Sequence, residues 1–139
     1  MTRVFADTLY WVAITSPRDQ WHKPALAART RLGPVSIVTT EEVLIEFLTA
    51  LSAGGPFLRR QAALVVRAII DDETVTVLPA SHESFMAGLD LYEQREDKEY
   101  SLTDCVSMAA MRTEQLSHAL TNDHHFRQEG FEVLIAKHK

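Results

Sequence analysis

The segment most informative about the fold is residues 100–134, YSLTDCVSMAAMRTEQLSHALTNDHHFRQEGFEVL. Ser101 and Asp104 have the three-residue spacing of a capping box, which predicts that a helix begins at this point. The apolar run at 118–120 then predicts a short strand, and residues 132–135 predict another, with a helical turn between them. This order of helix, strand, helix and strand is typical of an α/β protein.

The rest of the chain continues the same alternation. Strands are predicted at 3–6, 35–38 and 75–78, and helices at 8–15, 19–32, 40–52, 56–70 and 82–94. Thr39 and Glu42 also have capping-box spacing, so either Thr39 or Thr40 is expected to cap the third of these helices. Because parallel strands need crossover helices, the pattern predicts an α/β fold with a mainly parallel central sheet of about five strands and helices on both faces.

Composition sets broad limits on the function. The chain has 139 residues, 46% of them hydrophobic, which suits one domain over residues 1–139 with a proper core. No apolar run is long enough to cross a bilayer, and the single cysteine, Cys105, excludes an internal disulfide, so we expect a cytoplasmic protein. The net charge of −5 argues against avid, nonspecific nucleic-acid binding.

Four isolated carboxylates stand in apolar settings: Asp7, Glu46, Asp104 and Asp123. Asp7 directly follows the first predicted strand, and Asp123 follows the strand at 118–120. Since sites in parallel sheets form beyond the carboxyl ends of the strands, the topology permits all four acids to meet at one edge. A cluster of carboxylates with no obvious cysteine or histidine partner suits a hard cation such as Mg²⁺ or Mn²⁺.

Glu46 is the least easily explained of the four. It lies within Val43–Leu48, where every neighbour is apolar, and a helix that is apolar on all sides is expected to be buried. A buried, unpaired glutamate would be costly as an ion. A bound cation or an arginine partner would remove that cost.

The other three acids also have purely structural interpretations. Asp7 and Asp123 could each cap a helix, and Asp104 could be the acidic end of the capping box that Ser101 begins. The adjacent His124 and His125 are expected to point in different directions, so the sequence does not predict a zinc site.

With these residues assembled, the chain resembles the PIN-domain ribonucleases, especially the VapC-like toxins of bacterial toxin–antitoxin pairs. The matching segments are VFADTLYWVAI at 4–14, TTEEVLIEFLTAL at 39–51 and the stretch at 100–134 quoted above. The resemblance implies a three-layer α/β/α sandwich. It also implies that four acids bind Mg²⁺ or Mn²⁺ and carry catalysis, with three polar neighbours in support: Asp7, Glu46, Asp104 and Asp123, supported by Thr8, Thr121 and Asn122.

The function that follows from this resemblance is a metal-dependent endoribonuclease, a toxin that acts on RNA and is neutralised by a cognate antitoxin. A homodimer is the expected assembly. Two alternatives stay open, namely a protein-interaction module whose acids only cap helices, and a PIN protein that processes RNA without a toxin role. A phosphoacceptor receiver domain fits less well, because Asp7 stands alone where that class needs paired acids.

Overall fold

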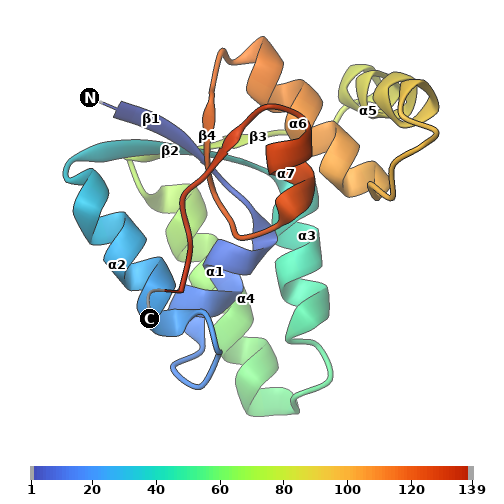
Figure 1. Ribbon diagram of the computed structural model, residues 1–139. Helices are drawn as coiled ribbons and strands as arrows, with labels where there is room; N and C mark the ends of the chain where they lie inside the picture. Colours follow the sequence, from blue (N-terminus) through green and yellow to red (C-terminus); the bar gives the residue numbers. More distant parts are fainter. Residues whose placement is uncertain (1, 138–139) are drawn as a thin grey trace.

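The structure, a computed structural model, describes residues 2–137. Its strands and helices alternate along the chain as the sequence predicts (Figure 1). The strands are β1 (Thr2–Ala6), β2 (Val35–Thr40), β3 (Val75–Leu78), β4 (His118–Leu120) and β5 (Glu132–Val133). The helices are α1 (Thr8–Thr15), α2 (His22–Leu32), α3 (Glu41–Ala50), α4 (Pro56–Asp71), α5 (His82–Gln94), α6 (Leu102–Thr113) and α7 (His124–Gln128).

The five strands form one parallel sheet in the order β3-β2-β1-β4-β5. β2 and β3 are added in turn on one side of β1, and β4 and β5 are then added on its other side. Right-handed crossovers therefore place α1 to α4 on one face and α5 to α7 on the other, as Figure 1 shows for α2 and α4 against α5 and α6. The predicted three-layer α/β architecture is confirmed.

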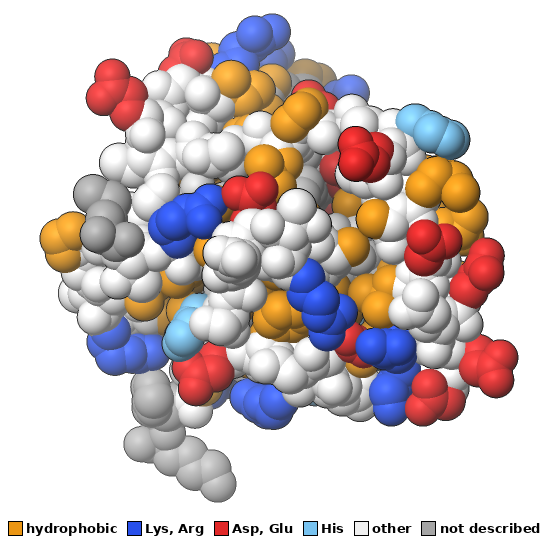
Figure 2. All heavy atoms as spheres, turned by 90° about the horizontal axis from the view of Figure 1, so that it is seen from above, with side chains coloured by type: hydrophobic (Ala, Val, Ile, Leu, Met, Phe, Trp, Pro, Cys, Tyr) orange, Lys and Arg blue, Asp and Glu red, His pale blue; other side chains and the backbone are white. Residues whose placement is uncertain are grey.

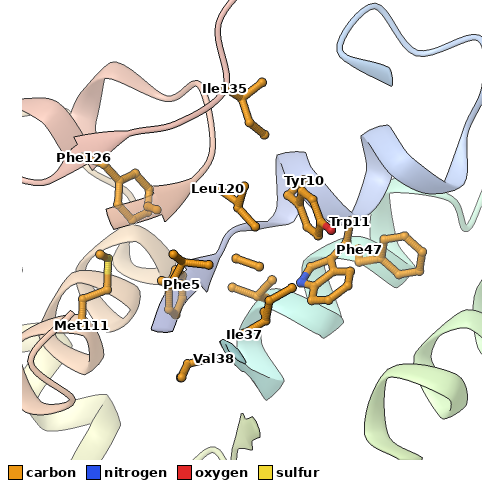
Figure 3. Close-up of a cluster of buried hydrophobic side chains, with 14 of the residues drawn as sticks. Phe5, Tyr10, Trp11, Ile37, Val38, Phe47, Met111, Leu120, Phe126 and Ile135 are labelled. Carbon is orange, nitrogen blue, oxygen red and sulfur yellow. The ribbon is translucent and has the colours of Figure 1, made fainter. Parts of the chain in front are cut away.

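The core lies on both sides of the central strands. Val4, Phe5 and Ala6 of β1 are fully buried, because a strand covered on both faces has no solvent side. Figure 3 shows the side chains that converge on these strands from the helices and from the C-terminal segment. They include Tyr10, Trp11, Phe47, Met111, Phe126 and Ile135, all buried.

Thr40, and not Thr39, is the residue that caps α3. Its hydroxyl accepts a hydrogen bond from the Val43 N–H at 3.0 Å, so the spacing of Thr39 and Glu42 does not form a capping box. Thr39 instead lies at the buried end of β2. Its hydroxyl donates to the Ala6 carbonyl at 2.8 Å and accepts from the Trp11 indole at 3.3 Å, which ties β2 to β1 and α1.

The prediction that the helix containing Glu46 is buried on all sides is wrong. Val43, Leu44 and Phe47 pack into the core, but Ile45 is 60% exposed and Leu48 is 37% exposed. A single layer of neighbouring helices covers only one side of α3. The apolar residues on its other side face solvent.

Helices α5 and α6 pack closely on each other where Gly88 meets Val106. A Cβ atom at Gly88 would lie 2.5 Å from the Val106 Cγ2 atom, so only glycine allows this approach. On the surface, acidic and basic side chains are interspersed on the face that Figure 2 shows from above. Among residues 2–137, no helix is both long and apolar enough to span a membrane.

Candidate active site

The candidate site lies where the direction of strand order changes. β1 and β4 are neighbours in the sheet but the crossovers leave them in opposite directions, and such switch points open a crevice at the strands' carboxyl ends. Asp7 follows β1 and Asp123 follows β4 after two residues. A hydrogen bond from the Asp7 N–H to the Leu120 carbonyl, at 3.3 Å, holds the two strand ends together.

Asp7 is the most buried of the four acids, with 7% of its surface exposed. It stands at the N-cap position of α1 but makes no side-chain capping bond; its Oδ2 accepts from the Thr121 hydroxyl at 3.0 Å. Burial raises the pKa of Asp7 to about 7. Hydrogen bonds from the Thr8 backbone and the Thr121 hydroxyl lower this pKa, and the charges of Asp104 and Glu46 raise it further. Those two acids therefore lie close enough to repel it.

Glu46 projects from α3 toward the start of α1. Its Oε1 accepts the Thr8 hydroxyl at 2.7 Å, and its side chain is half-buried. The predicted need for a partner is thus met in part by a hydroxyl and not by an arginine. A single hydroxyl leaves the charge of the carboxylate uncompensated, which keeps Glu46 available to a cation.

Asp104 and Asp123 both cap helices, as their structural interpretations predict. Asp104 Oδ2 accepts from the Ser101 N–H at 3.2 Å, which completes the capping box at α6. Asp123 Oδ1 accepts from the His125 N–H at 2.9 Å at the start of α7. Burial, with the charge of Asp123, raises the pKa of Asp104 against the opposing Ser101 hydrogen bonds. These capping bonds engage one oxygen of each carboxylate and leave the other oxygen without a hydrogen bond within residues 2–137.

Thr121 connects Asp7 with Asp123, whereas Asn122 contacts neither acid through its side-chain hydrogen bond. The Thr121 hydroxyl donates to Asp7 and accepts from the Asp123 N–H at 3.1 Å, so it fixes the spacing of the two. The Asn122 amide donates to the Ile135 carbonyl at 2.5 Å. It thereby anchors the segment after β5 rather than a carboxylate.

The sequence interpretation missed the role of the two histidines beside these acids. His125 Nδ1 lies 3.4 Å from Asp104 Oδ2 and 3.3 Å from Asp123 Oδ1. The rings of His124 and His125 lie 4.4 Å apart, so the expectation that they point in different directions is wrong. The short helix α7 begins at His124 with Asp123 as its N-cap, and both histidines lie in its first turn with Nδ1 near Asp123 Oδ1. The signal in the sequence was the run Asp123-His124-His125 itself.

Two arginines, Arg95 at the end of α5 and Arg112 in the last turn of α6, serve the fold. Glu129, whose side chain is 4% exposed, binds Arg95 at 2.5 Å and Arg112 at 2.6 Å. Although burial alone would raise it, the pKa of Glu129 is lowered by these two arginines. Tyr100 also donates to Glu129, at 3.3 Å, and its ring meets the His125 ring edge-on. This cluster supports α7, and with it the position of Asp123.

The donor set of the four acids fits a hard divalent cation. The hydrogen bonds within residues 2–137 engage one oxygen of each carboxylate: Asp7 Oδ2, Glu46 Oε1, Asp104 Oδ2 and Asp123 Oδ1. Oxygen ligands of this kind, with water in the remaining positions, are what Mg²⁺ and Mn²⁺ prefer. An acid such as Asp7, whose pKa is raised by burial and further by nearby acids, gains most from such an ion, which would stabilise its charged form.

Comparison with known proteins places this geometry in a family. The PIN domain family model matches residues 4–132. The chain is 29% identical over 135 residues to the 23S rRNA-specific endonuclease VapC20 of Mycobacterium tuberculosis, covering 92% of this chain and 95% of that protein.

Solved structures share the fold. The crystal structure of M. tuberculosis VapC20, a Sarcin-Ricin loop cleaving toxin, superposes with a TM-score of 0.84 at 23% identity, over 96% of this chain and 99% of that chain. VapBC2 from Rickettsia felis, bound to a DNA fragment from its promoter, has a TM-score of 0.63 at 14% identity, over 95% of this chain and 97% of that chain. FitAcB from Neisseria gonorrhoeae has a TM-score of 0.64 at 14% identity, over 94% and 96%. The chain belongs to the PIN domain family.

Proposed function

We propose that this chain is a metal-dependent endoribonuclease in which Asp7, Glu46, Asp104 and Asp123 hold Mg²⁺ or Mn²⁺. The observation that carries the proposal is Asp7, a carboxylate buried at the switch point of the sheet with Glu46 and Asp104 near enough to raise its pKa. Without a cation this arrangement is unfavourable, because burial and repulsion both oppose the charged form. A bound metal ion would offset the cost of charging these buried, mutually repelling carboxylates.

A divalent cation bound by these acids supplies an activated water molecule and neutralises charge on the phosphate. The chain's own residues position that chemistry. Thr121 sets Asp7 relative to Asp123, and Thr8 orients Glu46. Asp104 or Asp123 would orient the attacking water or accept its proton, since both are partly exposed while Asp7 is buried.

RNA loops are the substrate class that we propose. The VapC20 relative is named for action on 23S rRNA, and unpaired loops offer exposed bases and a flexible backbone that reach a recessed acidic site more easily than a duplex does. The interspersed surface charges seen in Figure 2 fit a protein that selects a shaped RNA rather than binding any polyanion. With such a substrate, we propose that the protein acts in the cytoplasm. We also propose that residues 1–139 form a single PIN-like domain.

We also propose an antitoxin partner that covers the exposed apolar side of α3 and α4. An apolar groove there is lined by Glu41, Leu44, Ile45, Leu48, Val66, Ile70, Val77 and Ala80. Ile45 and Ile70 in this groove are 60% and 58% exposed. Exposed apolar area of this extent is typical of a protein–protein interface. The partner would insert a basic side chain toward Glu46, and the assembly would be built on a homodimer of this chain.

The test is cleavage of purified ribosomal RNA by the partner-free protein in Mg²⁺ or Mn²⁺. We expect discrete fragments that disappear with EDTA and fall by at least about 100-fold in Glu46→Gln, because a lost metal ligand removes transition-state stabilisation. Glu42→Gln is the matched control, since Glu42 is half-buried on the same helix one turn earlier. Equal activity of the wild type and Glu46→Gln, or cleavage that persists in EDTA, would contradict the proposal.

A further inference from the structure

We propose that Asp123, His124 and His125 form a second cation site at the rim of the acidic cluster, one that takes a borderline transition-metal ion such as Zn²⁺. Asp123 belongs to both sites, so an ion bound here withdraws it from the catalytic cluster and inhibits cleavage. The inhibitory role rests on the proposed nuclease function. The binding of the ion does not.

The distances between the three donors suit a shared ion. Asp123 Oδ1 lies 3.3 Å from His125 Nδ1 and 3.8 Å from His124 Nδ1, and one donor atom from each residue lies within 4.8 Å of the other two. Two donors that bind one ion at the usual bond lengths of about 2.0–2.2 Å lie about 3.0–3.5 Å apart. The Asp123–His125 pair already has this separation, and a small rotation of the exposed His124 brings it within range.

His125 Nδ1 lacks a hydrogen-bond partner within residues 2–137, although it is buried. Two carboxylate oxygens lie within 3.4 Å of it, yet neither is placed to accept a hydrogen bond from it. A buried polar atom without a partner requires an explanation, and a metal ion beside Asp123 provides one. The ring is also held in place, since Tyr100 packs edge-on against it and the His125 N–H fixes Asp123 Oδ1.

The donor chemistry distinguishes this site from the neighbouring one. Two imidazole nitrogens and one carboxylate oxygen match the ligand sets of Zn²⁺ and related ions, with a water in the fourth position. The acidic cluster offers only oxygen, which suits Mg²⁺. The affinity of mixed nitrogen and oxygen sites rises from Mn²⁺ toward Zn²⁺, so a small amount of Zn²⁺ can hold Asp123 against a large excess of Mg²⁺.

The binding test is a titration of the purified, metal-free chain with Co²⁺, followed by absorption spectroscopy, and with Zn²⁺, followed by calorimetry. We expect one equivalent of Zn²⁺ and visible Co²⁺ bands typical of low coordination number. His124→Gln should weaken both by at least about 10–100-fold, as even the loss of a supporting partner does at metal sites. Because His124 is 68% exposed, this variant does not disturb the core. His125→Gln should act in the same direction.

His118→Gln is the matched control. His118 also lies beside a carboxylate, with Nε2 at 2.7 Å from Glu132 Oε2, but it is not part of the three-donor group found within residues 2–137. This variant should bind like the wild type. No low-coordinate Co²⁺ spectrum in the wild type, or equal affinities of His118→Gln and His124→Gln, would overturn the site.

The inhibition test measures the ratio of cleavage rates with and without Zn²⁺, in excess Mg²⁺, for each variant separately. The wild type and His118→Gln should lose activity at the Zn²⁺ concentration that fills the site, whereas His124→Gln should need at least about 10-fold more. An active enzyme that cuts RNA equally well with the site filled would overturn the inhibitory role. A chain that binds Co²⁺ but cuts no RNA would refute the nuclease function and leave the metal site standing.

Discussion

Replacing Asp7 with asparagine tests whether burial raises the pKa of this carboxyl group in the metal-free protein. The pKa of Asp7 is raised from 3.8 to about 7. Since the folded state then binds a proton that the unfolded chain has released, the free energy of unfolding falls as pH rises from 3.8 to about 7, and it stays lowered above that pH. Asparagine has no such titration and nearly the same shape.

The magnitude follows from the part of this window that an assay can reach. In the range from pH 5 to pH 8, the carboxyl group of Asp7 is already ionised in the unfolded chain but stays protonated in the folded protein up to about pH 7. The two states therefore differ by one proton over about two pH units. At about 1.4 kcal/mol per unit, the wild type should lose about 3 kcal/mol relative to Asp7→Asn between these two pH values. The stability of the wild type relative to the variant should therefore fall as pH rises.

The assay is urea denaturation in EDTA at pH 5 and at pH 8, with Asp90→Asn, a substitution on the exposed side of α5, as the control. Asp90→Asn should follow the wild type at both pH values. Adding Mn²⁺ at pH 8 should restore the stability of the wild type, because a ligand that binds only the folded state stabilises it, and should do little for Asp7→Asn. Identical pH dependence of the wild type and Asp7→Asn in EDTA would show that burial does not raise the pKa of Asp7.

Three further substitutions test the surroundings of the site by denaturation. Thr121→Val should lower stability by about 1–2 kcal/mol, because it leaves the buried Asp7 carboxyl without its hydroxyl donor; an unchanged midpoint would contradict this. Glu129→Gln should cost about 2 kcal/mol at neutral pH, and the deficit should shrink as pH falls below 4.5, since a lowered pKa contributes stability above the unfolded value that is lost in acid. A deficit that is the same at pH 3 and pH 7 would exclude the ion pairs as its cause. Gly88→Ala should cost about 1–3 kcal/mol by forcing α5 away from Val106, while full stability would mean that the two helices pack loosely.

The sequence predicted the fold well because the alternation of strands and helices depends on local pattern. Capping residues such as Ser101 and glycines such as Gly130 set the ends of elements independently of tertiary contacts. The choice between Thr39 and Thr40 could not be made in this way. Both can cap a helix, and only the neighbouring strand shows that Thr39 is needed to bind the Ala6 carbonyl.

The acids of the candidate site were also accessible from sequence, since a carboxylate in an apolar setting needs a partner wherever it lies. Their environments were not. Glu46 was expected in a fully buried helix, but the exposure of Ile45 depends on which neighbours cover α3, and that is decided by the packing of distant segments. The convergence of His124 and His125 on Asp123 depends on where a five-residue helix begins, which spacing alone does not fix.

We propose above that four carboxylates from separate elements form one cation site. The most direct test is a calorimetric titration of the metal-free chain with Mn²⁺, comparing the wild type with Asp7→Asn, Glu46→Gln and the control Glu42→Gln. We expect the wild type and the control to bind Mn²⁺ with equal affinity, and each of the other two variants to lose at least about tenfold in affinity. Equal binding by all four proteins would show that these acids do not form a shared cation site.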